Sequence, residues 1–76
     1  MTVYHPSEFV SEELAYADMS QEEFATFVGL NKRHAAEFFD CRKRVDGEMA
    51  LKIAKFFGTS PQLWLSLQDM WDQYYG

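Results

Sequence analysis

The fold of this chain is decided by the stretch Ser20-Gln-Glu-Glu-Phe-Ala-Thr-Phe-Val-Gly-Leu-Asn31-Lys-Arg-His-Ala-Ala-Glu-Phe-Phe-Asp-Cys-Arg-Lys-Arg-Val45. Apolar residues recur at helical spacing in its first part, a glycine follows, and a second segment of helical pattern begins soon after. Glycine adopts the left-handed backbone conformation that ends a helix without steric cost. The pattern therefore predicts two short helices, at about residues 21–28 and 32–39, joined by a turn at Gly29.

Polar residues mark the start of both helices. Ser20 is a preferred N-cap, and Glu23 three positions later completes a capping box with it. Asn31 is likewise a preferred N-cap for the second helix. Ala25 is small enough to let a second helix cross closely. Together these features predict a helix-turn-helix at about residues 20–40, the motif whose second helix is offered to the DNA major groove.

Charge is distributed unevenly along the chain, whose net value is −5. Residues 1–30 carry six acidic side chains and neither lysine nor arginine, whereas residues 31–45 carry five basic side chains against two acidic ones. The basic segment is thus the one that a helix-turn-helix would place on phosphate. The side chains that we expect to contact DNA are Gln21, Asn31, Lys32, Arg33, His34, Glu37, Arg42, Lys43 and Arg44.

These side chains have different expected roles. Lys32, Arg33 and His34 begin the second helix, where side chains reach base edges; the alternative is a solvated, charged turn. Glu37 either accepts a hydrogen bond from a cytosine amino group or repels DNA. Gln21 lies at a helix N-terminus, which suits a phosphate. The three basic residues that follow the second helix would add salt-sensitive phosphate contacts.

The remaining sequence predicts three more helices and hence one all-α, five-helix domain spanning residues 1–76. Pro6 suits a first helical position, which places a helix at about residues 6–17. Asp46 caps a helix that ends at Phe57-Gly58, and Ser60-Pro61 starts a last helix at about residues 61–75.

Two apolar stripes run along the last predicted helix. Leu63, Leu67, Met70 and Tyr74 form the stripe that we expect to dock on the core. Trp64, Trp71 and Tyr75 form a second stripe, interrupted only by Gln68, and exposed aromatic residues in one patch mark an association surface. These four residues, Gln68 included, predict a homodimer contact. Alternatively, both stripes are buried within one chain.

Composition limits the other function classes. Apolar residues make up 47% of the chain, which argues for a packed core, and a single cysteine excludes an internal disulfide and favours a reducing cytoplasm. No segment resembles a signal peptide or a membrane span. His5, His34 and Cys41 lack zinc-ligand spacing, and there is no glycine-rich phosphate loop. We therefore expect a cytoplasmic protein that is not an enzyme and needs no cofactor or metal.

Several blocks of the sequence match one known family. The blocks are His5-Pro6-x-Glu8, Ser20-Gln21-Glu22-Glu23, the Ala25/Gly29 pair, Arg42-Lys43-Arg44-Val45, Met49-Ala50-Leu51-x-Ile53-Ala54 and Phe57-Gly58-Thr59-Ser60-Pro61-x-x-Trp64-Leu65-x-Leu67-Gln68. Over about residues 5–71 the chain resembles the HigA-type (VapI-type) antitoxins of the XRE, lambda-repressor-like superfamily. The resemblance implies a five-helix antitoxin that neutralises a RelE-like, mRNA-cleaving toxin. It also implies a dimer that binds an operator palindrome and represses its own operon.

Three further expectations accompany this resemblance. Asp40-Cys41 stands where the family usually has Asn-Gly, which predicts a strained or differently shaped turn. Glu8, Glu12 and Glu13 offer an acidic face to a basic toxin, although such a face is commonly only solubilising. The alternative functions are a protein-binding module of the same fold with little DNA binding, and a stand-alone or phage-type repressor without a toxin.

Overall fold

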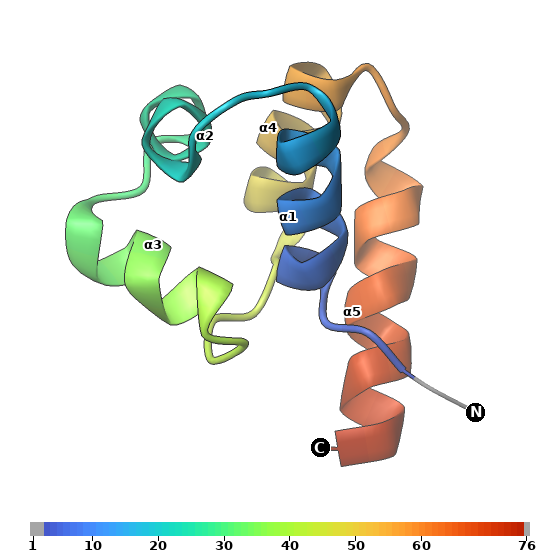
Figure 1. The fold of residues 1–76 in the computed structure, drawn as a ribbon. Helices are drawn as coiled ribbons and strands as arrows, with labels where there is room; N and C mark the ends of the chain where they lie inside the picture. Colours follow the sequence, from blue (N-terminus) through green and yellow to red (C-terminus); the bar gives the residue numbers. More distant parts are fainter. Residues whose placement is uncertain (1–2, 76) are drawn as a thin grey trace.

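The computed structural model describes residues 3–75 of the chain. Those residues form five helices and no strand: α1 (Pro6–Tyr16), α2 (Gln21–Val28), α3 (Lys32–Phe39), α4 (Gly47–Phe57) and α5 (Pro61–Tyr75). In Figure 1, α1, α4 and α5 pack together while α2 and α3 extend to one side. The predicted all-α, five-helix fold is confirmed, and every helix end lies within one residue of its predicted position.

The helix starts use the caps that the sequence predicts, with one addition. Ser20 and Glu23 form the capping box of α2, and Asn31 and Asp46 accept backbone N–H groups at the starts of α3 and α4. The addition is at α1, where His5 is the N-cap: its Nδ1 accepts from the Ser7 N–H at 3.1 Å. Because a capping histidine is uncommon, the sequence pattern at this position predicted only a helix start.

Aromatic rings fill the core between the helices. Phe24 of α2 and Phe38 of α3 are both 0% exposed, and their ring centroids lie 5.8 Å apart. Trp64 of α5 packs beside Phe57 of α4 at 5.7 Å. The core therefore joins the projecting α2–α3 pair to the other three helices. Within residues 3–75, no helix is both long and apolar enough to cross a lipid bilayer.

The orientation of α5 differs from the prediction. Trp64 and Gln68, expected in a dimer contact, are each only 2% exposed and are buried within the chain. Trp71 is half-buried, and Tyr75 is exposed. Gln68 is accommodated because its side chain accepts the Val45 N–H at 2.8 Å, and its own amide donates to Asp72. A polar residue in the stripe thus marks a satisfied core position, so the assignment of Trp64 and Gln68 to a dimer face was wrong.

The other stripe of α5 is correspondingly more exposed than expected. Leu63 and Met70 are each 42% exposed and Tyr74 is 61% exposed, whereas Leu67 is half-buried against the core. The two stripes lie about 100° apart on the helix, because one residue advances the helix by that angle. A rotation of that size about the helix axis therefore decides which of them docks. Three of the four residues that the sequence assigned to docking, Leu63, Met70 and Tyr74, therefore form the outward apolar face.

Candidate nucleic-acid interface

The α2–α3 pair is fixed by its turn. Gly29 ends α2 in the left-handed conformation with φ of 77°, and the Leu30 N–H donates to the Ala25 carbonyl at 2.8 Å. Ala25 is 7% exposed, which allows the two helices to approach closely. Asn31 then starts α3, because its Oδ1 accepts the His34 N–H at 2.8 Å. The structure gives Asn31 this capping role at the start of the helix.

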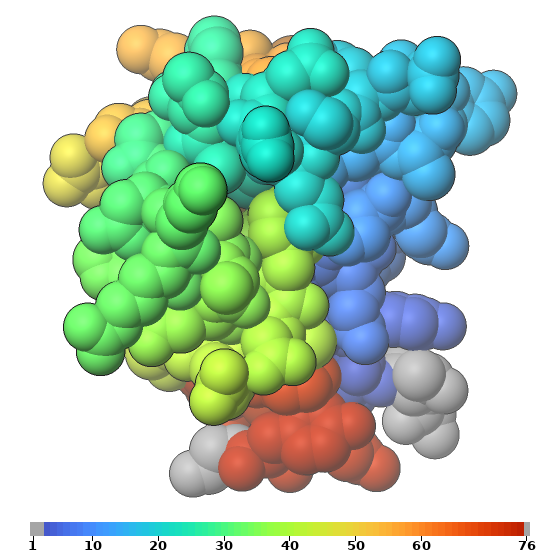
Figure 2. Space-filling model, turned by 60° about the vertical axis from the view of Figure 1, so that its left-hand side comes forward, coloured from blue at the N-terminus to red at the C-terminus, as the bar shows by residue number. Residues whose placement is uncertain are grey.

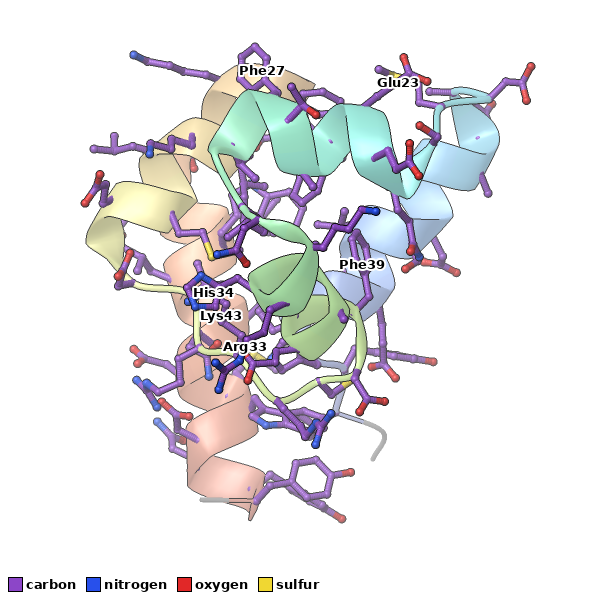
Figure 3. The ribbon with its side chains drawn as sticks, turned by 90° about the vertical axis from the view of Figure 1, so that its left-hand side faces the viewer. Glu23, Phe27, Arg33, His34, Phe39 and Lys43 are labelled. Atoms are coloured by element: carbon purple, nitrogen blue, oxygen red, sulfur yellow. The ribbon has the colours of Figure 1, made fainter. Side chains whose placement is uncertain are left out.

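The first turn of α3 presents the basic side chains to solvent. Lys32, Arg33 and His34 are all exposed, whereas Phe38 in the last turn of the helix is fully buried. Figure 2 shows α2 and α3 together forming the face of the molecule turned toward the viewer. In Figure 3, Arg33 and His34 lie on the same side of α3 as Lys43, with Phe39 on the other side. The three basic side chains are thus free to meet a ligand at this face.

Glu37 lies one turn further along α3. Its side chain is half-buried, and none of the ion pairs among residues 3–75 includes it. A residue four positions after Arg33 shares its side of the helix. The outer face of α3 therefore changes from basic at its start to acidic at its end.

Gln21 is exposed in the first turn of α2 and lines an open hollow of about 500 Å³ between α2 and α3. Lys32 lines the same hollow, together with Ala35, Ala36 and Phe39. Small side chains on α3 create this space. The structure thus brings Gln21 and Lys32 to one edge of the interface.

The basic loop between α3 and α4, residues 40–45, is partly neutralised within the chain. The Arg42 Nε lies 2.9 Å from the Asp40 carboxylate, and the Arg44 guanidinium pairs with Asp72 of α5. The hydrogen bond from the Arg44 side chain is the main reason why the pKa of the Asp72 carboxyl is lowered. Lys43 is half-buried and belongs to none of the ion pairs within residues 3–75.

Cys41 makes the turn that starts this loop. Its φ is 61°, a left-handed conformation that a residue with a Cβ adopts at a cost. The expected strain at Asp40-Cys41 is therefore present. No three His, Cys, Asp or Glu side chains among the described residues lie close enough to hold a metal ion.

His5 contacts the basic loop, a role that the sequence motifs did not predict. It is 1% exposed, and its Nε2 lies 3.1 Å from the Lys43 carbonyl, inside the basic loop. Because Nδ1 accepts from the Ser7 N–H, the ring proton is assigned to Nε2, which donates to that carbonyl. Burial is the largest influence on the imidazole and lowers its pKa below 6.5. The only sequence signal was a histidine next to Pro6 in the matched block.

The comparisons with known proteins agree with this fold. No family model matches the chain. An uncharacterized HTH-type transcriptional regulator of Escherichia coli K12, YddM, is 32% identical over 66 residues, covering 87% of this chain and 70% of YddM. A solved antidote protein of the HigA family from Coxiella burnetii is 36% identical with a TM-score of 0.86, covering 95% of this chain and 79% of that one.

A more distant solved structure is the Pseudomonas aeruginosa antitoxin HigA with the higBA promoter. It is 23% identical with a TM-score of 0.85, covers 96% of this chain and 80% of that one, and shares the fold. The two nearer relatives share sequence with this chain over most of their lengths, and the Coxiella burnetii structure also shares its architecture. This chain therefore belongs to the HigA family of helix-turn-helix antitoxins.

Proposed function

We propose that this chain is a DNA-binding antitoxin that represses its own operon as a dimer and neutralises a RelE-like, mRNA-cleaving toxin. The observation that carries the DNA-binding part is the exposed cluster of Lys32, Arg33 and His34 at the start of α3, on the same side as Lys43 (Figure 3). Arginine and lysine at this position donate to guanine O6 and N7 in the major groove. The structure of the Pseudomonas aeruginosa antitoxin HigA with the higBA promoter supports the same use of the fold.

The test is a fluorescence anisotropy titration of the purified protein with its own upstream DNA, over a salt series and with scrambled DNA as control. Lys32→Ala and Arg33→Ala should each weaken specific binding by about 1–3 kcal/mol if they read a base. Lys55→Ala is the matched control, because Lys55 is exposed near the end of α4, outside the helix-turn-helix. Equal affinity for operator and scrambled DNA at low salt would contradict the proposal.

The dimer contact is proposed for the exposed face of α5. Leu63, Met70 and Tyr74 form an apolar stripe along this helix, and exposed apolar stripes of this kind mark association surfaces. A two-fold dimer would place two copies of α3 in major grooves about 34 Å apart. Met70→Glu should convert the dimer to a monomer by light scattering. A Met70→Glu protein that keeps the wild-type mass would exclude this face.

The toxin contact is proposed for the acidic residues of α1. Glu12 and Glu13 are exposed, and no lysine or arginine occurs before residue 32. Glu8 is also exposed, but its carboxylate accepts the His5 N–H at 2.8 Å as part of the cap. Acidic surfaces attract the basic surface expected of an RNA-cleaving protein. The test is whether a neighbouring gene encodes a small basic protein, and whether that protein co-purifies with this chain as a stable complex, which is the result we expect.

A protein-binding module with little DNA binding is the second candidate. Arg42 and Arg44 are paired with carboxylates in the chain, and Glu37 adds a negative charge to α3. Two exposed aromatic residues, Tyr16 at 94% and Phe27 at 54%, lie outside α3 and the basic loop. The titration above distinguishes the two candidates: toxin binding without DNA preference would favour this one.

A further inference from the structure

The buried polar side chains of this domain gather at one place. Among residues 3–75, three polar side chains are buried: His5 and Ser7, each 1% exposed, and Gln68, 2% exposed. All three contact residues of the basic loop 40–45. A core polar group costs stability unless it is paired, and apolar residues would fill the same space more simply. Their common location therefore indicates that they hold this loop.

The start of α1 holds the first half of the loop. His5 Nε2 donates to the Lys43 carbonyl at 3.1 Å, and its other nitrogen is fixed by the Ser7 N–H. The Ser7 hydroxyl lies 3.6 Å from the Cys41 sulfur, next to the strained left-handed residue. The rings of Phe38 and Trp71 flank the imidazole, with centroids 5.9 and 5.1 Å away. The imidazole therefore packs against two aromatic rings and is hydrogen-bonded as well.

The middle of α5 holds the second half. Gln68 Oε1 accepts the Val45 N–H at 2.8 Å, and Gln68 Nε2 donates to Asp72 at 3.0 Å. Asp72 pairs with the side chain of Arg44. Both ends of the segment 43–45 are thus tied to helices far away in the sequence. This arrangement preorganises the loop, and preorganisation raises affinity by lowering the cost of ordering on binding.

We propose that His5 and Gln68 are positioning residues that hold loop 40–45 in the conformation in which Lys43 contacts a DNA phosphate. This inference rests on the proposed DNA binding. Neither side chain is exposed, so neither touches DNA itself. Their effect acts through the Lys43 carbonyl and the Val45 N–H, the two backbone groups that they bind.

The variants His5→Asn and Gln68→Met separate this role from folding. Asparagine is a good N-cap but is too short to reach the Lys43 carbonyl, and methionine keeps the size of Gln68 without its hydrogen bonds. Ile53→Val is the control, because Ile53 is fully buried in α4 and its truncation destabilises the fold but removes none of the hydrogen bonds that hold the loop. All measurements are made at a temperature where circular dichroism shows each variant folded. If Gln68→Met does not fold, His5→Asn carries the test.

We expect both variants to bind operator DNA about tenfold more weakly, the effect of removing one charge-assisted hydrogen bond to a phosphate. Their salt dependence should also become shallower by about 0.9 for each phosphate that the loop no longer binds. Ile53→Val should keep the wild-type affinity and slope. Wild-type affinity and slope in both loop variants would overturn the proposal, as would an equal decrease in affinity in Ile53→Val.

A double-mutant cycle with Lys43→Ala tests whether His5 affects DNA affinity through Lys43. If His5 acts by positioning Lys43, the double variant His5→Asn/Lys43→Ala should bind about as weakly as Lys43→Ala alone. Additive effects on the free energy of binding would show that His5 acts elsewhere and would contradict the positioning role.

Hydrogen exchange separates failure of this inference from failure of the proposed function. The Val45 amide should lose protection in Gln68→Met and His5→Asn but keep it in Ile53→Val. If the wild-type protein does not bind operator DNA at all, the proposed function fails, and the exchange data still decide whether these residues order the loop. If DNA binds but Val45 protection is unchanged in both loop variants, the positioning inference fails alone.

Discussion

At the scale of single residues, Cys41 shows the backbone strain that arises when a residue with a Cβ stands where the family usually has glycine. The position was identifiable from the sequence, because Asp40-Cys41 stands where the family usually has Asn-Gly. Its φ of 61° shows that the turn keeps the left-handed form and accepts the cost of a side chain there. From the sequence alone, the turn could have been either strained or differently shaped. Which of the two shapes it adopts depends on the contacts that hold the loop.

Cys41→Gly should therefore stabilise the protein. Glycine adopts this conformation without a Cβ clash, and relief of that clash is worth about 1 kcal/mol. The measurement is urea unfolding under reducing conditions, with the free energy of unfolding extrapolated to water. Cys41→Ser is the matched control, since it keeps the Cβ and should show no such gain. A glycine variant that is less stable than wild type would show that the Ser7–Cys41 contact outweighs the strain.

His5 provides a prediction for the pH dependence of stability. Its pKa in the folded chain lies below 6.5, the ordinary value expected after unfolding, because burial disfavours the imidazolium ion. The unfolded chain therefore binds more protons below about pH 6.5, and the free energy of unfolding decreases with decreasing pH. This contribution is fully present above pH 6.5 and is lost as pH falls through the folded pKa. The measurement is urea unfolding at several pH values between about 7.5 and 5.

Two histidine variants isolate this contribution. His5→Asn should remove it and leave only the slope that the carboxyl groups produce. His34→Asn is the matched control, because His34 is exposed on α3 and its side chain makes none of the hydrogen bonds among the described residues. A wild-type pH slope in His5→Asn would assign the effect to other groups.

At the scale of helices, the sequence predicts boundaries well and orientations poorly. Ser20, Asn31 and Asp46 are local signals, and local hydrogen bonds fixed the helix starts as expected. The orientation of α5 depends on partners more than twenty residues away, because Gln68 pairs with Val45. Hydropathy alone ranks Gln68 as an exposed residue. Only its hydrogen bond with the Val45 N–H explains its burial.

The pairing of Asp72 with Arg44 leads to a prediction about DNA affinity. Asp72→Asn should release Arg44 for phosphate, strengthen operator binding about threefold and steepen the salt dependence. Asparagine can still accept the hydrogen bond from Gln68, so the loop anchor is retained. The matched control is Asp69→Asn, which removes the same charge from an exposed position of α5 that joins none of the ion pairs within residues 3–75. Equal gains in both variants, measured by anisotropy, would mean that net charge alone is responsible.

At the scale of the whole molecule, the chain separates charge of opposite sign. The first 30 residues contain aspartate and glutamate but neither lysine nor arginine, whereas basic side chains outnumber acidic ones in residues 31–45. The sequence reveals this separation, and it also located the candidate interface on α3 and the loop after it. It could not reveal that Arg44 is paired, since its partner Asp72 lies far away in the sequence, and the pairing of Arg42 with the nearby Asp40 became clear only from the shape of the loop. The free basic charge of the interface is therefore concentrated at the start of α3 and at Lys43.

This separation predicts that toxin and DNA respond oppositely to charge on α1. In the double variant Glu12→Gln/Glu13→Gln, association with the proposed basic toxin should slow about tenfold at low salt. The difference should shrink as salt rises, because steering between exposed charges is screened. DNA affinity should rise slightly, since two repelling charges are removed. Glu8 is left unchanged because it caps α1. Stopped-flow association with toxin and anisotropy with operator DNA measure the two effects.

The control is Gln62→Lys/Ser66→Lys, which changes the net charge by the same amount at exposed positions near the start of α5. If toxin association depends on the α1 surface, this control should slow it far less than the glutamate variant does. If both variants slow it equally, only the overall charge of the molecule attracts the toxin, and the contact must be sought elsewhere. The exposed rings of Tyr16 and Phe27 would then be the next surface to test, because aromatic side chains anchor protein interfaces without depending on charge.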